Sequence, residues 1–97
     1  MVSDDIQLRR MKKGQLDQLV DAQNDIFSDY VAPMRSSRTF FLDFQQSVGG
    51  RMENVIVAMD GERIVGYVNP VVDGDEAWIG GVGVVPSHRS RGIGSKL

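Results

Sequence analysis

A loop that carries glycine and arginine, residues 86–94, follows a β-prone segment and leads into residues that favour a helix. Amide groups at a helix N-terminus have no intrahelical partner, and the helix dipole adds partial positive charge there. Glycine lets the backbone approach an anion closely, and Arg89 and Arg91 add full positive charge. The loop therefore suits a phosphate or pyrophosphate. A glycine that caps a helix or permits a packing turn is the simpler alternative.

The glycine spacing separates this loop from two other phosphate-binding motifs. A Walker loop needs Gly-Lys-Ser/Thr after its first glycine, and a dinucleotide fingerprint needs a third glycine within a parallel unit; neither is present here. The segment instead reads Val84-x-Pro86-x-x-Arg89-x-x-Gly92-x-Gly94. This pattern resembles the acetyl-coenzyme A (acetyl-CoA) signature of the GNAT superfamily of N-acetyltransferases, R/Q-x-x-G-x-G/A after a V-x-P strand end. The order of the preceding elements extends the resemblance over residues 6–97.

The resemblance implies an enzyme that transfers an acetyl group from acetyl-CoA, its cosubstrate, to a primary amine by direct attack and without a metal. In this family, strand amides bond the pantetheine arm and the thioester carbonyl, and loop amides hold the pyrophosphate. A carbonyl that accepts a hydrogen bond from a strand amide is polarised for attack. By position, the cofactor-binding residues would be Val82, Gly83, Val84, Arg89, Ser90, Arg91, Gly92, Ile93, Gly94 and Ser95.

Two departures from the family pattern affect the interpretation. His88 stands where such proteins often carry an aromatic residue, and we expect it to be a surface residue. The family also continues with a full helix, a splayed strand and further elements, so we expect a single partial domain, residues 1–97, truncated after the acetyl-CoA-binding loop and inactive alone. The alternative function is a non-catalytic fragment that binds acyl-CoA or phosphate and needs another chain to complete its sheet.

Residues outside the loop could serve the amine acceptor, which the first helices of this family border. Glu76 lies near the start of the cofactor strand, where a carboxylate could deprotonate the amine directly or through water. A stripe of aspartates could attract a cationic amine, although a solvated helix face explains it more simply. The three phenylalanines of the second helix are most simply core. The stripe comprises Asp17, Asp21, Asp25 and Asp29, and the phenylalanines are Phe40, Phe41 and Phe44.

The periodicity of apolar residues predicts the elements that position these groups. Alternation predicts a short strand over 5–11, and an apolar arc at helical spacing predicts an amphipathic helix over 15–29. A second short helix follows Ser36-Ser37 and stops at Gly49-Gly50. Strands over 55–59, 64–72 and 77–85 are joined by turns at Asp60-Gly61 and 73–75, and Pro70 marks a bulge, an edge or the end of pairing. We expect an α+β or mixed α/β fold, the N-terminal half of a GNAT-like domain, ending at the start of the cofactor-binding helix.

Composition limits the other possibilities. The net charge of −2 provides no global positive field for nucleic acid, and the absence of cysteine excludes disulfides and thiolate chemistry. No apolar stretch is long enough to span a bilayer, and the first residues do not resemble a signal peptide. The final Ser-Lys-Leu continues the family's helix start, so we do not interpret it as a peroxisomal signal and expect a cytoplasmic protein. An unguarded edge along 77–85 would favour homo-oligomers.

Overall fold

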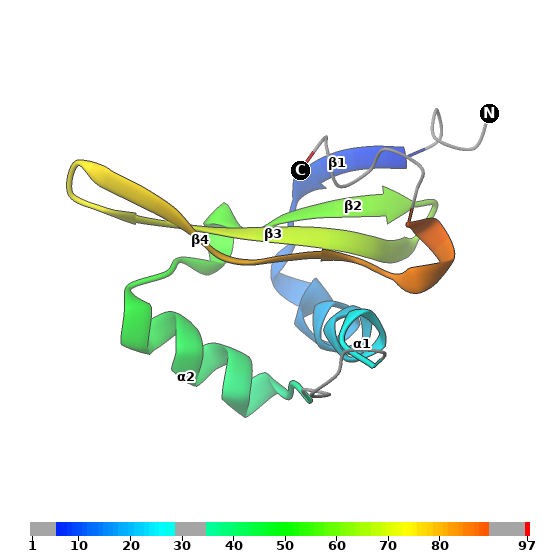
Figure 1. Cartoon of the computed structure of the whole chain (residues 1–97), viewed down its shortest axis with the longest axis horizontal. Coiled ribbons are helices and arrows are strands. Elements are labelled where there is room, and N and C mark those ends of the chain that lie inside the picture. The colour runs from blue at the N-terminus through cyan, green and yellow to red at the C-terminus, as the bar shows by residue number, and fades with distance from the viewer. Residues whose placement is uncertain (1–5, 29–34, 90–96) are drawn as a thin grey trace.

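The computed structural model describes residues 6–28, 35–89 and 97, and these form one antiparallel sheet with two helices on one face (Figure 1). The strands occur in the order β1-β2-β3-β4, so sequence neighbours are also sheet neighbours. This confirms the predicted mixed α and β order of a strand, two helices and a three-stranded meander. The elements are β1 Ile6–Arg10, α1 Leu16–Ile26, α2 Arg38–Val48, β2 Ile56–Asp60, β3 Arg63–Asp73 and β4 Glu76–Val84, with 3-10 segments at Lys13–Gln15, Met52–Asn54 and Pro86–His88.

The helix α1 forms where the apolar arc was predicted, and its buried residues include Leu16, Leu19, Val20 and Ile26. It ends at Ile26, earlier than residue 29, because the next residues form a turn: the Ser28 hydroxyl donates to the Asp25 carbonyl at 2.7 Å. The aspartates at 17, 21 and 25 are exposed, which confirms the solvated-face interpretation for these three. Asp29 lies outside the described residues.

The helix α2 is bounded by the residues that the sequence indicated. The Ser37 hydroxyl accepts a hydrogen bond from the Phe40 amide at 3.0 Å, and Gly49 adopts a left-handed φ of 73° after the last turn. The prediction that all three phenylalanines are core is wrong for one of them. Phe41 is buried and Phe44 is half-buried, but Phe40 is 50% exposed because it lies on the flank of α2, outside the buried cluster.

The two hairpins have two-residue loops. Asp60 pairs with Arg63, so the first loop consists of Gly61 and Glu62, one residue later than the predicted Asp60-Gly61, and Gly61 takes the left-handed φ of 63°. In the second hairpin, the pairing shifts between Asn69 and Pro70 and leaves Gly80 as an extra residue in β4. Of the three alternatives predicted for Pro70, which has no amide to donate, the structure shows the bulge, and pairing continues beyond it to Asp73.

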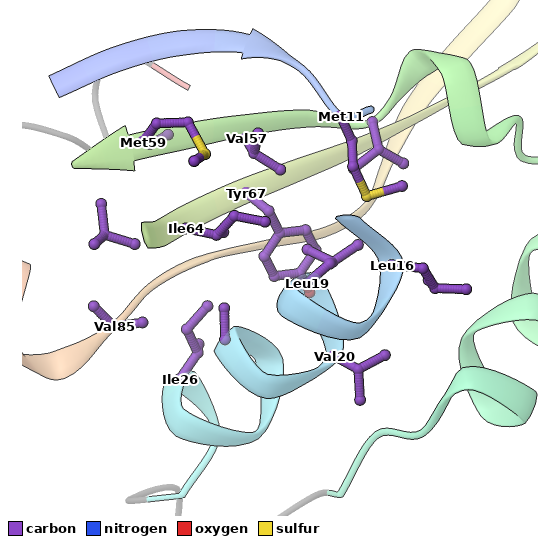
Figure 2. Close-up of a cluster of buried hydrophobic side chains, with 14 of the residues drawn as sticks. Met11, Leu16, Leu19, Val20, Ile26, Val57, Met59, Ile64, Tyr67 and Val85 are labelled. Atoms are coloured by element: carbon purple, nitrogen blue, oxygen red, sulfur yellow. The ribbon is translucent and has the colours of Figure 1, made fainter. Parts of the chain in front are cut away.

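The core lies between α1 and the middle of the sheet (Figure 2). Leu19 and Ile26 from the helix pack against Val57 of β2 and Tyr67 of β3, and Val85 extends the cluster beyond β4. The hairpin of β3 and β4 runs past the shorter strands, so part of β4 extends beyond this core (Figure 1). Neither described helix has the length and apolarity needed to cross a membrane.

Candidate functional site

The strand β4 has one free edge in the described part of the chain, since it pairs with β3 alone. The Val85 amide donates to the Val65 carbonyl at 2.8 Å, so the main-chain groups of residue 85 face β3. Main-chain groups alternate in direction along an antiparallel strand. Those of Gly83 therefore also face β3, and those of Val82 and Val84 point to the free edge. Of the three predicted strand residues, two present their amides outward.

The Arg89 side chain joins this edge to α1. Its Nε donates to the Val84 carbonyl at 3.0 Å, and its Nη2 donates to the Ile26 carbonyl at 2.7 Å, at the last residue of α1. A cation at a helix C-terminus is favourable because the carbonyls there carry partial negative charge. The sequence predicts that Arg89 contacts the cofactor; the structure shows it holding the start of the predicted loop against β4 and α1.

His88 anchors the same segment, and the prediction that it lies on the surface is wrong. Its ring is buried, its Nε2 lies 2.8 Å from Asp60 Oδ2, and its Nδ1 lies 2.8 Å from the Ser87 hydroxyl. The partner Asp60 ends β2, and its distance of 28 positions in sequence explains why the pairing could not be foreseen. The remaining predicted loop residues lie outside the described part of the chain: Ser90, Arg91, Gly92, Ile93, Gly94 and Ser95.

A cavity of about 310 Å³ opens beside the bulge of β4, between the strand and the two helices. Five of its twelve described lining residues are aromatic, and its lining includes residues at the bulge, where a Cβ on Gly81 would lie 2.8 Å from Tyr67 Oη. The sequence pattern predicted that Phe40, Phe41 and Phe44 are core residues and did not indicate that they line a cavity. The described lining consists of Gln23, Phe27, Arg35, Ser36, Phe40, Phe41, Phe44, Tyr67, Asn69, Gly80, Gly81 and Val82.

Three polar residues of the cavity lining, Gln23, Ser36 and Asn69, form side-chain hydrogen bonds. Gln45 Nε2 donates to Asn69 Oδ1 at 3.1 Å, and Asn69 Nδ2 donates back to Gln45 Oε1 at 2.7 Å, in buried surroundings. The Ser36 hydroxyl donates to Gln23 Oε1 at 2.7 Å. These pairs connect α2 to β3, and α1 to the residues just before α2, beside the cavity.

The acidic residues that were predicted to serve the acceptor do not line this cavity. Glu76 is exposed at the first position of β4, and Val82 follows it six positions later, about 20 Å away at the usual rise per residue. A general base must reach the attacking amine directly or through one water. Glu76 therefore fits the predicted role only if the amine lies well away from Val82. Asp17 pairs with Arg38 at 3.0 Å, and Asp25 lines a different hollow on α1. Within the described ranges, no cluster of His, Asp and Glu could hold a metal ion.

Comparison with known proteins points to one family. The family model described as "Acetyltransferase (GNAT) family" matches residues 16–97. Among solved structures, a GCN5-related N-acetyltransferase from Sphaerobacter thermophilus is 28% identical, with a TM-score of 0.75, over 94% of this chain and 29% of that one. The search of curated proteins gave no match.

Two more distant structures share the fold. The ribosomal-protein-S18-alanine N-acetyltransferase from Escherichia coli is 15% identical, with a TM-score of 0.72, over 95% of this chain and 54% of that one. A GNAT family acetyltransferase from Brucella melitensis, solved in complex with acetyl-CoA, is 19% identical, with a TM-score of 0.69, over 95% of this chain and 62% of that one. The chain thus spans less than two thirds of each of these structures.

Proposed function

Because the chain belongs to the acetyltransferase (GNAT) family, we propose that it binds acetyl-CoA along the free edge of β4 and contributes this site to acetyl transfer onto a primary amine. The observation that carries the proposal is the pair of outward-facing main-chain positions, Val82 and Val84, beside an apolar cavity. The complex of the Brucella relative with acetyl-CoA supports the choice of ligand.

The residues at the edge fit such a ligand. The pantetheine arm carries amide groups, which can pair with a free strand edge as an added strand does. The Val84 carbonyl already accepts from Arg89, which leaves the amides of Val82 and Val84 as the donors offered there. The loop that would hold the pyrophosphate, residues 90–95, follows directly from the segment that His88 and Arg89 anchor.

Acetyl transfer requires that the site stabilise negative charge on the thioester oxygen and that it favour the neutral form of the amine. The amine nitrogen attacks the thioester carbon, a C–N bond forms, the C–S bond breaks, and coenzyme A leaves as a thiol with the proton that the amine loses. In our proposal, the Val82 amide donates to the thioester carbonyl oxygen and stabilises the negative charge that develops on it. The apolar cavity supplies the second requirement, because burial in apolar surroundings lowers the pKa of an ammonium and so favours the neutral, nucleophilic amine.

Two substitutions at one position test the proposal. Val82→Pro removes the amide that would contact the thioester, and an edge strand tolerates proline where its N–H does not pair with a neighbour. Val82→Ala keeps the amide and is the matched control. We expect calorimetry to show much weaker acetyl-CoA binding for the proline variant than for the alanine variant, with similar unfolding temperatures. Equal affinity of the two variants would exclude the Val82 amide as a ligand.

A second candidate function is a non-catalytic module that binds acyl-CoA and needs another chain to complete its sheet. The free edge of β4 and the partial coverage of the matched structures favour it. Measuring coenzyme A release during incubation with acetyl-CoA and amines distinguishes the two. Turnover by this chain would support the enzyme, whereas acetyl-CoA binding without turnover would support the module.

A further inference from the structure

The cavity beside the β4 bulge has the composition of a specific binding pocket, and this inference rests on the proposed function. Its volume of about 310 Å³ is at the small end of the range for ligand pockets, which suits a small molecule or a single side chain. Four phenylalanines and one tyrosine contribute to its wall. An aromatic wall binds aromatic or large apolar groups through buried area and ring contacts.

The charges around the cavity also favour some amine acceptors over others. Among its described lining residues, Arg35 carries the only formal charge, and it is exposed at the rim. None of the three exposed aspartates of α1 lines this cavity: Asp17 pairs with Arg38, and Asp21 and Asp25 line the separate hollow that includes Arg63. A polyamine or a lysine in a basic peptide would bring additional positive charge toward an arginine. A carboxylate would be attracted to it.

We infer that the acetyl acceptor is a small amine with an aromatic or large apolar body and a carboxylate, its body in this cavity and its carboxylate at Arg35. The body places the nitrogen near the bulge, where Gly80, Gly81 and Val82 line the cavity close to the proposed thioester position. The absence of side chains at the two glycines keeps that approach open. Spermidine, which has neither an apolar body nor an anion, would be a poor acceptor.

Binding of defined amines to the 97-residue chain, with coenzyme A present, tests the inference without requiring turnover. The probes are L-phenylalanine, phenethylamine, which lacks the carboxylate, and spermidine, with affinity measured by ligand-observed NMR titration. We expect phenylalanine to bind tightest and spermidine to bind at least about tenfold more weakly. Spermidine binding as tightly as phenylalanine, or no binding by either aromatic amine, would overturn the inference.

Matched variants locate the contacts. Phe40 and Leu42 are on the same helix and similarly exposed, at 50% and 41%, but only Phe40 lines this cavity. Phe40→Ala should weaken phenylalanine binding about three- to tenfold, and Leu42→Ala should leave it unchanged. Arg35→Gln should weaken phenylalanine about three- to tenfold and phenethylamine less than about twofold. Equal effects of the two helix variants, or of Arg35→Gln on the two aromatic amines, would overturn the proposed contacts.

The outcomes separate this inference from the proposed function. Coenzyme A affinity is measured for each variant in the same samples, because the proposed cofactor site is β4 and the following loop. If coenzyme A binds and the amines do not follow the expected order, the acceptor class is wrong and the cofactor site stands. If coenzyme A does not bind, the proposed function fails, whatever the amines do.

Discussion

Replacing Gly83 with alanine would test how closely α1 approaches β4 at the proposed site. An ideal Cβ at Gly83 would lie 2.6 Å from Ile26 Cγ2, far inside the 3.5–4.0 Å or so at which carbon atoms attract. Ile26 is 1% exposed and branched at Cβ, so its methyl group cannot swing aside without disturbing the core. The helix or the strand must move instead.

Two effects of opposite sign decide the magnitude. Alanine in place of a strand glycine stabilises by about 0.5–1 kcal/mol through the entropy of the unfolded chain. Overpacking a close contact costs about 1–3 kcal/mol. The two effects together give a loss between about 0 and 2.5 kcal/mol, and we expect Gly83→Ala to lower the free energy of unfolding by about 1 kcal/mol, which corresponds to a fall in Tm of roughly 4–8 °C for a domain of this size.

Urea denaturation followed by far-UV circular dichroism measures the change, and Gly14→Ala is the matched control. Gly14 is exposed, and a Cβ there would meet nothing within 4 Å. The control should therefore be unchanged or slightly more stable. If Gly83→Ala were instead more stable than the parent by about 0.5–1 kcal/mol, the close contact between Ile26 and β4 would be refuted, because the entropy effect alone gives that gain.

Four further predictions address the anchors and the site. His88→Ala should lower the free energy of unfolding by about 1–3 kcal/mol, because it removes a buried ring and a partner of Asp60; an unchanged denaturation midpoint would show that the anchor is unimportant. Gly92→Asp should abolish coenzyme A binding in calorimetry, since a side chain and a negative charge would meet the pyrophosphate; unaltered affinity would place the site elsewhere. Glu76→Gln should leave the turnover of any active form unchanged between pH 6 and 9, given about 20 Å of strand to Val82; reduced turnover at unchanged coenzyme A affinity would restore it as the base. The free edge of β4 should promote self-association, so the mass from light scattering should rise with concentration, and a constant monomer mass would contradict this.

Local patterns predicted the elements well because their causes are local. The apolar arc of α1, the capping hydroxyl of Ser37 and the left-handed glycine after α2 act within a few residues of chain. The bulge at Pro70 follows from its missing amide donor. Errors occurred where a local signal permits two solutions: the Asp60-Gly61 turn shifted by one residue, since strand register rather than turn preference decides which residue closes the hairpin.

At the candidate site, too, local sequence predicted some features, and others depend on tertiary structure. The motif from Val84 to Gly94 identified the family from glycine and arginine spacing, and the resemblance implied that amides of the preceding strand contact the cofactor. No local rule could show which amide faces outward, because that depends on the register with β3. Nor could it show that Phe40 lines a cavity while Phe41 is core.

The amino-acid sequence by itself determined the periodicity of each element, the turns and the loop chemistry, since these depend on backbone preferences and on side chains only a few residues apart. Tertiary structure decided which distant groups meet. The Arg89 guanidinium reaches the Ile26 carbonyl across 63 positions, and the His88 ring reaches Asp60 across 28. Such contacts form only after the helices have packed on the sheet, because pairing and packing set the distances between segments that no local preference relates.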